Sequence, residues 1–190
     1  GFATDDYPVI KKLWPSCACT HRIVEAAEIL SSKINSISEI EKVIIKTPEP
    51  FIKVSRFHIP NNEAEARFSP SYCAMVTLQN GKLKPNDFMN ETFLTKEKQD
   101  LTKIAKIEPY KVPVSFTEMD PNFPCSIHIF MKNGKKLEKI IKDVKGGLER
   151  PLNIEDLRIK FLECSKNEEF LNLLIISKYE NSTKFIEKMI

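Results

Sequence analysis

A β-hairpin pattern in the second half of the chain sets the strongest limit on how it can fold. Residues 125–132 are rich in β-branched and aromatic side chains, and residues 135–142 form a second such run. Asn133-Gly134 separates the two runs, and this pair is typical of a two-residue type I′ turn. The pattern therefore predicts two antiparallel strands. Because an isolated hairpin is only marginally stable in water, other elements must pack against it.

Helical patterns surround this hairpin. Apolar residues recur at helical spacing after Thr20, a favourable N-cap, and predict a helix over residues 21–33. Ser69 and Pro70 predict the start of a second long helix, which Gly81 ends after Asn80. Shorter helices are predicted over residues 85–89, 95–105, 154–165, 168–178 and 182–189, further strands over 40–46 and 107–114, and irregular structure over 51–62.

These elements predict an α+β fold in two parts. Residues 1–150 are expected to form a two-layer α+β domain, in which helices cover one face of an antiparallel sheet. Residues 151–190 are predicted to be a separate helical segment. Its apolar side chains, among them Leu157, Phe161 and Leu173, are more than three short helices can bury by themselves.

Composition and charge exclude several classes of protein. The 29 basic and 26 acidic residues are interspersed and give a net charge of only +3, too balanced for a protein that binds nucleic acid through bulk charge. No apolar run approaches the roughly 20 residues that span a membrane. The first six residues carry charge where a signal peptide is apolar. The five cysteines are therefore expected to be free thiols in the cytoplasm, and the Cys17-x-Cys19 spacing does not suit a zinc site.

One short stretch concentrates reactive groups around the start of the first helix. Lys12 precedes Trp14-Pro15, Cys17 lies before the helix N-terminus, and His21 lies in the first turn. A lysine there can bind a carboxylate, a helix N-terminus lowers the pKa of a thiol, and a neutral imidazole can accept a proton. Each residue also has a structural interpretation: a solvated lysine, a buried packing cysteine, and a histidine that bonds to a carbonyl.

Other polar residues have simpler interpretations. Lys53, Arg56, His58 and Arg67 form a second basic group, which is most simply a surface loop with ordinary ion pairs. His128 lies in an apolar strand and is interpreted as sheet packing. The residues alone thus indicate a soluble α+β domain with a possible anion site.

Three stretches, in order along the chain, resemble the MmgE/PrpD family. Residues 12–27 begin with a match to its K-x-[YFW]-P-x-C-x-x-T-H motif, and residues 60–72 are similar to its E-A-[KR]-[FH]-S-x-x-Y segment. Residues 146–161 are similar to its G-x-x-x-x-P-L-[ST]-x-x-[DE]-L-x-x-K-F segment. The resemblance implies an α+β lid domain followed by C-terminal helices. In family members these helices pack on an all-helical domain formed by the N-terminal half of the chain. Gly1-Phe2 resembles the pair that precedes the lid.

The resemblance also implies roles for single residues. Lys12 corresponds to the family's active-site lysine. Cys17 corresponds to a position where the dehydratase and decarboxylase branches have histidine, while many other members have cysteine. His21 corresponds to the histidine of the Thr-His pair that opens the helix. Arg67 and Ser69, in the second motif, are expected to bind substrate. A tyrosine of the decarboxylase branch would fall near residues 51–52, where Phe51 and Ile52 cannot donate a proton.

The implied function is that of a cofactor-independent, metal-free lyase or isomerase that acts on a di- or tricarboxylate. A 2-methylcitrate dehydratase-like reaction is expected first, while decarboxylation and epimerisation stay open. The expected partners are the N-terminal helical domain, on the same or a separate chain, and a second copy in a homodimer, so that these 190 residues alone would be inactive. Two alternatives also stay open: a non-enzymatic α+β module that binds an anion or a protein, and a split or degenerate homologue that needs a second chain.

Overall fold

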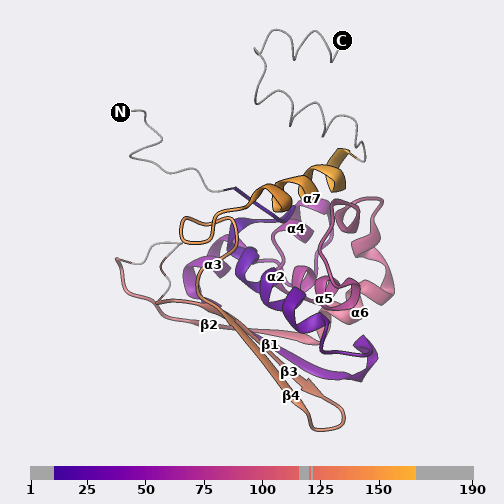
Figure 1. Cartoon of the computed structure of the whole chain (residues 1–190). Helices are drawn as coiled ribbons and strands as arrows, with labels where there is room; N and C mark the ends of the chain where they lie inside the picture. The colour runs from indigo at the N-terminus through magenta and orange to yellow at the C-terminus, as the bar shows by residue number, and fades with distance from the viewer. Residues whose placement is uncertain (1–10, 116–119, 121, 166–190) are drawn as a thin grey trace, which may run out of the picture. The chain divides into compact units, whose positions relative to one another are not determined.

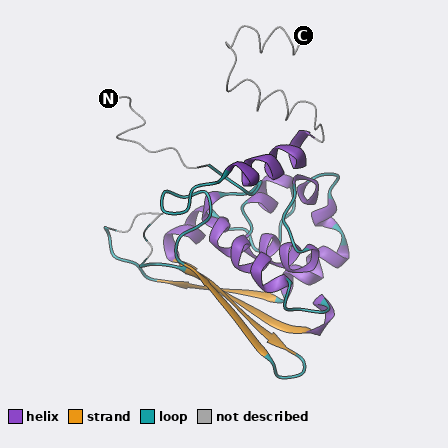
Figure 2. Ribbon diagram, in the orientation of Figure 1, coloured by secondary structure: helices purple, strands orange, loops and turns teal. Residues whose placement is uncertain are grey.

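The computed structural model describes residues 11–115, 120 and 122–165. It divides into two units, Gly1–Pro151 and Leu152–Ile190, which are described separately. In the first unit, helices cover one face of a four-stranded sheet with the order β2-β1-β3-β4 (Figures 1 and 2). The strands are β1 (Ile40–Pro48), β2 (Ala105–Tyr110), β3 (Cys125–Met131) and β4 (Lys136–Ile141). The predicted α+β fold class is confirmed.

The sheet is mixed, which corrects the expectation of a wholly antiparallel one. β3 pairs antiparallel with both β1 and β4, but β1 and β2 run parallel, with Val43 opposite Ala105. The chain between β1 and β2 forms several helices and returns to the end of the sheet where β1 begins. A connection of this length is what parallel strands require.

The predicted hairpin is present, but its turn differs from the prediction. The Met131 N–H donates to the Lys135 carbonyl at 2.9 Å, and the Gly134 N–H donates to the Met131 carbonyl at 2.9 Å. Residues 132–134 therefore form a three-residue loop. A type I′ turn needs two residues with positive φ, whereas Gly134, at +84°, is the one residue of this loop that has it. The prediction of a two-residue type I′ turn was wrong.

Helix α2 (Ala18–Ser31) begins three residues earlier than predicted. Cys17, not Thr20, is its N-cap: the Cys17 backbone is extended, and Thr20 Oγ1 donates to the Cys17 carbonyl at 2.8 Å from within the first turn. The threonine that suggested a cap thus bonds one turn back along the chain.

The helices between β1 and β2 are α3 (Glu49–Val54), α4 (Glu63–Arg67), α5 (Pro70–Asn80) and α6 (Lys96–Lys103). α3 lies where irregular structure was expected, because Pro50 falls in the first turn, the one place where a helix accepts proline. The predicted bounds of α5 are confirmed: Ser69 is its N-cap, and Gly81 ends it with φ +74°. The predicted helix near residue 85 is a 3₁₀ turn, Pro85–Phe88.

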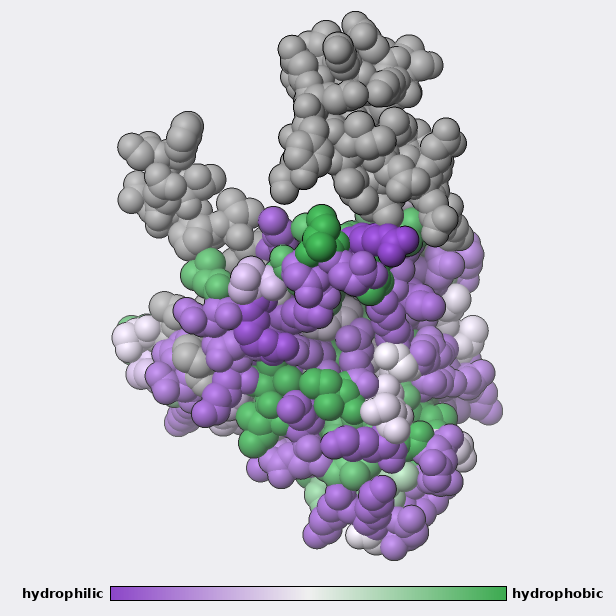
Figure 3. Space-filling model, viewed as in Figure 1, coloured by the Kyte–Doolittle hydropathy of each residue, from purple (hydrophilic) through white to green (hydrophobic). Residues whose placement is uncertain are grey.

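Two apolar clusters bury α2 on two sides. In the first, Ile23 and Ala27 of α2 pack with Val43, Ile127 and Ile129 of the sheet, all of them fully buried. Figure 3 shows hydrophobic residues gathered where α2 meets the sheet. The second cluster contains Trp14, Val24, Ala66, Tyr72, Cys73, Val76, Leu83, Phe88, Phe93 and Val144. With both sides packed, α2 holds the residues at its N-terminus firmly in place.

The second unit contains α7 (Ile154–Ser165), as predicted. Asn153 and Asp156 cap it reciprocally: the Asp156 N–H donates to Asn153 Oδ1 at 2.9 Å, and the Asn153 N–H donates to Asp156 Oδ2 at 3.1 Å. The helices predicted over residues 168–178 and 182–189 lie outside the described residues. Within the described part of the chain, no helix is long and apolar enough to cross a membrane.

Candidate functional site

The segment that carries Lys12 is tied down at three points. The Lys11 N–H donates to the Gly146 carbonyl at 3.2 Å, and the Cys17 N–H donates to the Arg67 carbonyl at 3.0 Å. Between them Trp14 is buried, and its Nε1–H donates to Glu28 Oε1 at 2.7 Å. Lys12 itself is exposed, with Nζ 3.5 Å from the Ser16 carbonyl. The ammonium group is thus held at the surface beside the start of α2.

The Cys17 thiol, at the N-terminus of α2, is acidic. A side-chain hydrogen bond with Cys19 lowers its pKa most, burial acts in the opposite direction, and the Ser55 hydroxyl, the Cys19 backbone N–H and the charge of Lys12 lower it further, to about 5. A helix N-terminus is also a site where thiolates are favoured. Cys17 is therefore ionised at neutral pH and can accept a proton.

Two fully buried thiols, those of Cys73 and Cys125, behave differently. Burial raises the pKa of Cys73 to about 12 and that of Cys125 to about 11. Both are neutral under ordinary conditions, as expected for packing residues. The acidity of Cys17 is therefore a property of its place in the fold.

His21 is buried in the first turn of α2 against Trp14, with the two rings edge to face and their centroids 5.3 Å apart. Its Nε2 lies 3.3 Å from the Ser16 carbonyl. Because a carbonyl can only accept a hydrogen bond, Nε2 must carry a proton here. This nitrogen therefore holds the loop before α2 and does not serve as a proton acceptor.

Arg67 links α4 to the same loop. Its Nη1 donates to the Pro15 carbonyl at 2.5 Å, and its Nε and Nη2 donate to Glu63 Oε1 at 3.1 and 2.6 Å. The guanidinium also lies over the Phe88 ring, 4.6 Å from its centroid. In this arrangement Arg67 positions the backbone between Lys12 and Cys17.

Ser69 is completely buried, and its hydroxyl is used by the backbone. Ser69 Oγ donates to the His58 carbonyl at 2.7 Å and accepts from the Tyr72 N–H at 3.1 Å. His58 in turn has its Nδ1 2.8 Å from Ser71 Oγ, and burial lowers its pKa. Ser69 therefore fixes the chain between α3 and α5.

The remaining basic residues make contacts elsewhere and are not part of the site around Cys17. Lys53 pairs with Glu49 on the surface of α3 at 3.5 Å, and Arg56 lies over the Phe57 ring. His128 is part of the sheet, with Nε2 2.9 Å from Ser126 Oγ and Nδ1 3.6 Å from Glu138 Oε1. Neighbouring Ile127 and Ile129 face the helices, so His128 lies on the opposite face of the sheet.

Sequence reasoning missed Ser16, Thr20 and Ser55 as parts of this site. Ser16 Oγ and Thr20 Oγ1 are 2.8 Å apart, and both residues are buried. Ser16 and Thr20 lie four residues apart across the start of the helix, so this pair of hydroxyl residues could have indicated a local contact. Ser55 is 38 residues away from Cys17 in the sequence, and no local sequence pattern indicates that it belongs to the site.

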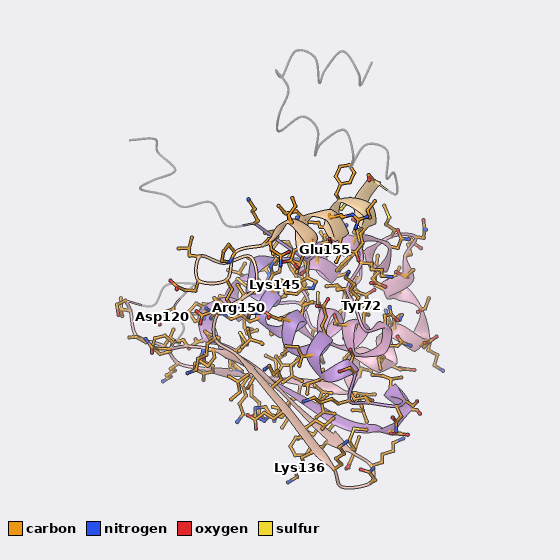
Figure 4. All side chains as sticks on the ribbon, viewed as in Figure 1. Tyr72, Asp120, Lys136, Lys145, Arg150 and Glu155 are labelled. Carbon is orange, nitrogen blue, oxygen red and sulfur yellow. The ribbon has the colours of Figure 1, made fainter. Side chains whose placement is uncertain are left out.

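A second loop fixes the start of the Lys12 segment. Glu25 of α2 accepts from the Lys145 N–H at 3.0 Å and pairs with Arg150 at 2.7 Å. Figure 4 labels Lys145 and Arg150 on this loop. Gly146, between them, accepts the Lys11 hydrogen bond and donates its own N–H to the Arg150 carbonyl at 2.7 Å. Among the described residues, no three His, Cys, Asp or Glu side chains converge in a way that could hold a metal ion.

Comparisons with known proteins agree with this arrangement of motifs. Residues 14–169 match the MmgE/PrpD C-terminal domain. The chain is also 27% identical over 165 residues to the cis-aconitate decarboxylase of Mus musculus, an alignment that covers 83% of this chain. The same alignment covers only 33% of the length of that relative, so this chain spans about a third of it. Since the domain match covers most of the chain and includes the site around Cys17, the chain belongs to the MmgE/PrpD family, through its C-terminal domain.

Proposed function

We propose that this chain is the lid-containing portion of a lyase that acts on a di- or tricarboxylate, with dehydration of a 2-methylcitrate-like substrate as the first candidate reaction. The observation that carries the proposal is a thiol with a pKa of about 5 whose acidity the charge of Lys12 helps to set, at a helix N-terminus. The relative named above, a decarboxylase, supports lyase chemistry in this family.

In this proposal Lys12 binds a substrate carboxylate and stabilises the negative charge that develops on it. The Cys17 thiolate accepts the proton from the carbon beside that carboxylate. The electron pair left on this carbon forms a double bond as the neighbouring hydroxyl group leaves. The Cys17 thiol then returns its proton to the leaving group, which departs as water and regenerates the thiolate.

The residues near α3 favour dehydration over decarboxylation. The resemblance places the tyrosine of the decarboxylase branch near residues 51–52. Phe51 is buried in the first apolar cluster, between α2 and the sheet, and neither Phe51 nor Ile52 has a side-chain proton to donate. His21 and Arg67 serve in this proposal as residues that hold the loop, and Ser69 as one that holds the chain after α3.

The proposed partners are a small carboxylate and an N-terminal helical domain, which would supply the other half of the cleft. A homodimer in the cytoplasm is part of the same proposal. The 190 residues alone should therefore not turn over 2-methylcitrate, citrate or cis-aconitate. Measurable turnover by them would refute the assignment as a lid.

The test is replacement of Lys12 in the complete protein that contains this chain. Lys12→Ala should lower kcat for the active substrate by about 10²–10³-fold, the usual effect of removing one group that stabilises developing charge. Lys11→Ala is the matched control, because Lys11 is the exposed neighbour on the same segment, and it should keep nearly full activity. Equal activity of the two variants would exclude the role of Lys12. An inactive complete protein that still binds an anion or a protein would favour the non-enzymatic module.

A further inference from the structure

His58 lies close to the site around Cys17, although the two residues are far apart in sequence. The His58 carbonyl accepts a hydrogen bond from Ser69 Oγ at 2.7 Å, and the Arg67 carbonyl accepts one from the Cys17 N–H at 3.0 Å. Arg67 and Ser69 are two residues apart, which is a span of at most about 7 Å. The same short stretch of chain therefore bonds to both Cys17 and His58 and keeps their backbones near each other.

The imidazole of His58 is held by a buried hydroxyl group. Its Nδ1 lies 2.8 Å from Ser71 Oγ, and Ser71, in the first turn of α5, is completely buried. Within the described residues, the Ser71 hydroxyl has no other partner. If Nδ1 carried the proton, the hydroxyl hydrogen of Ser71 would be buried without an acceptor, which is unfavourable. The Ser71 hydroxyl therefore donates to Nδ1, and in the neutral ring Nε2 carries the proton.

The Nε2–H group of His58 is left for a ligand. The residue is exposed, and its Nε2 bonds to no other group in the part of the chain that the structure describes. Burial lowers the pKa of the imidazole, which keeps the ring neutral at pH 7. Since the contact with Ser71 favours one tautomer and one orientation of the ring, Nε2–H is a hydrogen-bond donor of fixed direction.

The charges near His58 favour an anionic ligand. Lys12 is an exposed ammonium group beside the start of α2, and Arg56 is an exposed residue two positions before His58. The carboxylate of Glu63 is held by Arg67 at 2.6 Å. A carboxylate only accepts hydrogen bonds, so it suits both an ammonium group and a neutral N–H donor.

We propose that His58 binds substrate: its Nε2–H donates a hydrogen bond to one carboxylate of the substrate, while Lys12 binds another. The inference rests on the proposed function, to which it adds a second carboxylate contact. Ser71 is a positioning residue, because it sets the tautomer of His58 without touching the substrate. A monocarboxylate would make one of the two contacts, so the pair selects di- and tricarboxylates.

The tautomer is measured first, from long-range ¹H–¹⁵N correlation spectra of the 190-residue chain at a pH well above the pKa of the imidazole. The His58 signals are assigned by their loss in His58→Asn. They should show a protonated Nε2 and an unprotonated Nδ1, and Ser71→Ala should give a mixture of the two tautomers. A protonated Nδ1 in the wild-type chain would overturn the proposal, whatever the complete protein does.

Two substitutions in the complete protein then separate ligand binding from the contact with Ser71. In His58→Asn, the amide oxygen can still accept from Ser71 Oγ, but no N–H reaches the Nε2 position; in His58→Gln, an N–H does. His58→Asn should raise the Kd of citrate, the probe, by about 10–100-fold, the usual effect of losing a hydrogen bond to a charged group. His58→Gln should restore much of the affinity. His128→Asn is the matched control on the opposite face of the sheet and should leave the Kd unchanged.

The outcomes separate this inference from the proposed function. If His58→Asn changes neither the Kd of citrate nor the KM of a carboxylate that the complete protein turns over, His58 is not a ligand contact, and the proposed function stands. If His58→Asn weakens citrate binding but Cys17→Ser keeps full turnover, the contact stands and the base of the proposed function is overturned. A complete protein that neither binds citrate nor turns over a di- or tricarboxylate would overturn both.

Discussion

The Glu25–Arg150 ion pair offers a sharp test of how the loop of residues 144–150 supports the candidate site. The side chain of Glu25 is only 7% exposed, while that of Arg150 is 45% exposed, and their charged atoms are 2.7 Å apart. Arg150 also donates to the Asp143 carbonyl at 2.6 Å. Replacing Arg150 with Met keeps much of the apolar stem but leaves the Glu25 carboxylate without its cation.

The expected loss can be bounded from both sides. Removing one partner of a fully buried pair costs about 3–5 kcal/mol, whereas exposed pairs contribute about 0–1 kcal/mol. Here one partner is buried and the other half-exposed, and Glu25 keeps its bond from the Lys145 N–H. We therefore expect Arg150→Met to lower the free energy of unfolding by about 2 kcal/mol. For a chain of this size that corresponds to a fall in Tm of about 4–8 °C.

Urea denaturation and thermal unfolding of the 190-residue chain measure this loss directly. Lys103→Met is the matched control, because it breaks a pair of the same 2.7 Å length in which both side chains are more than half exposed. It should cost about 0–1 kcal/mol. If Arg150→Met is no more destabilising than Lys103→Met, the pair does not anchor the loop, and the account of how Lys12 is held must be changed.

Two further predictions concern the candidate site. Ser69→Ala should lower the free energy of unfolding by about 1–2 kcal/mol, since the Tyr72 N–H and the His58 carbonyl both lose a partner; unchanged stability in urea would show that the hydroxyl is not needed as a cap. The free energy of unfolding should also rise between about pH 5 and pH 9 because of Cys17. In this range the thiol is ionised in the native state but still carries its proton in the unfolded chain. This contribution to stability is lost as the pH falls through 5. Cys17→Ser should flatten the part of the rise above pH 7, where His58 is neutral, and an equal rise in the variant would contradict the lowered pKa.

Much of the local structure could be predicted from residues close together in sequence. Ser69 and Gly81 were identified as the ends of α5, and the strands of the hairpin and the helix α7 were also predicted. These features depend on a cap, a glycine with positive φ or an alternating pattern, all of which act over a few residues. The prediction failed where two local solutions compete, as at Thr20 and at Asn133-Gly134.

The candidate site was predicted in part. Lys12 and Cys17 were identified because both lie in one short motif, and the structure places them at one helix end. The contacts that Arg67 and Ser69 make with the backbone were not predicted, because those partners come from other segments. Ser55 carried no signal, because a serine in a helix-ending position is ordinary until the fold buries its hydroxyl.

The sequence by itself determined the family, the α+β class and the ends of the main helices, since these depend on motifs and on interactions between near neighbours. Only the tertiary structure decided that β2 runs parallel to β1, that Arg67 bonds to the loop before α2, and that Glu25 pairs with the loop of residues 144–150. These features join segments far apart in the chain. Their geometry depends on the path of the whole backbone and on which polar groups that path removes from water.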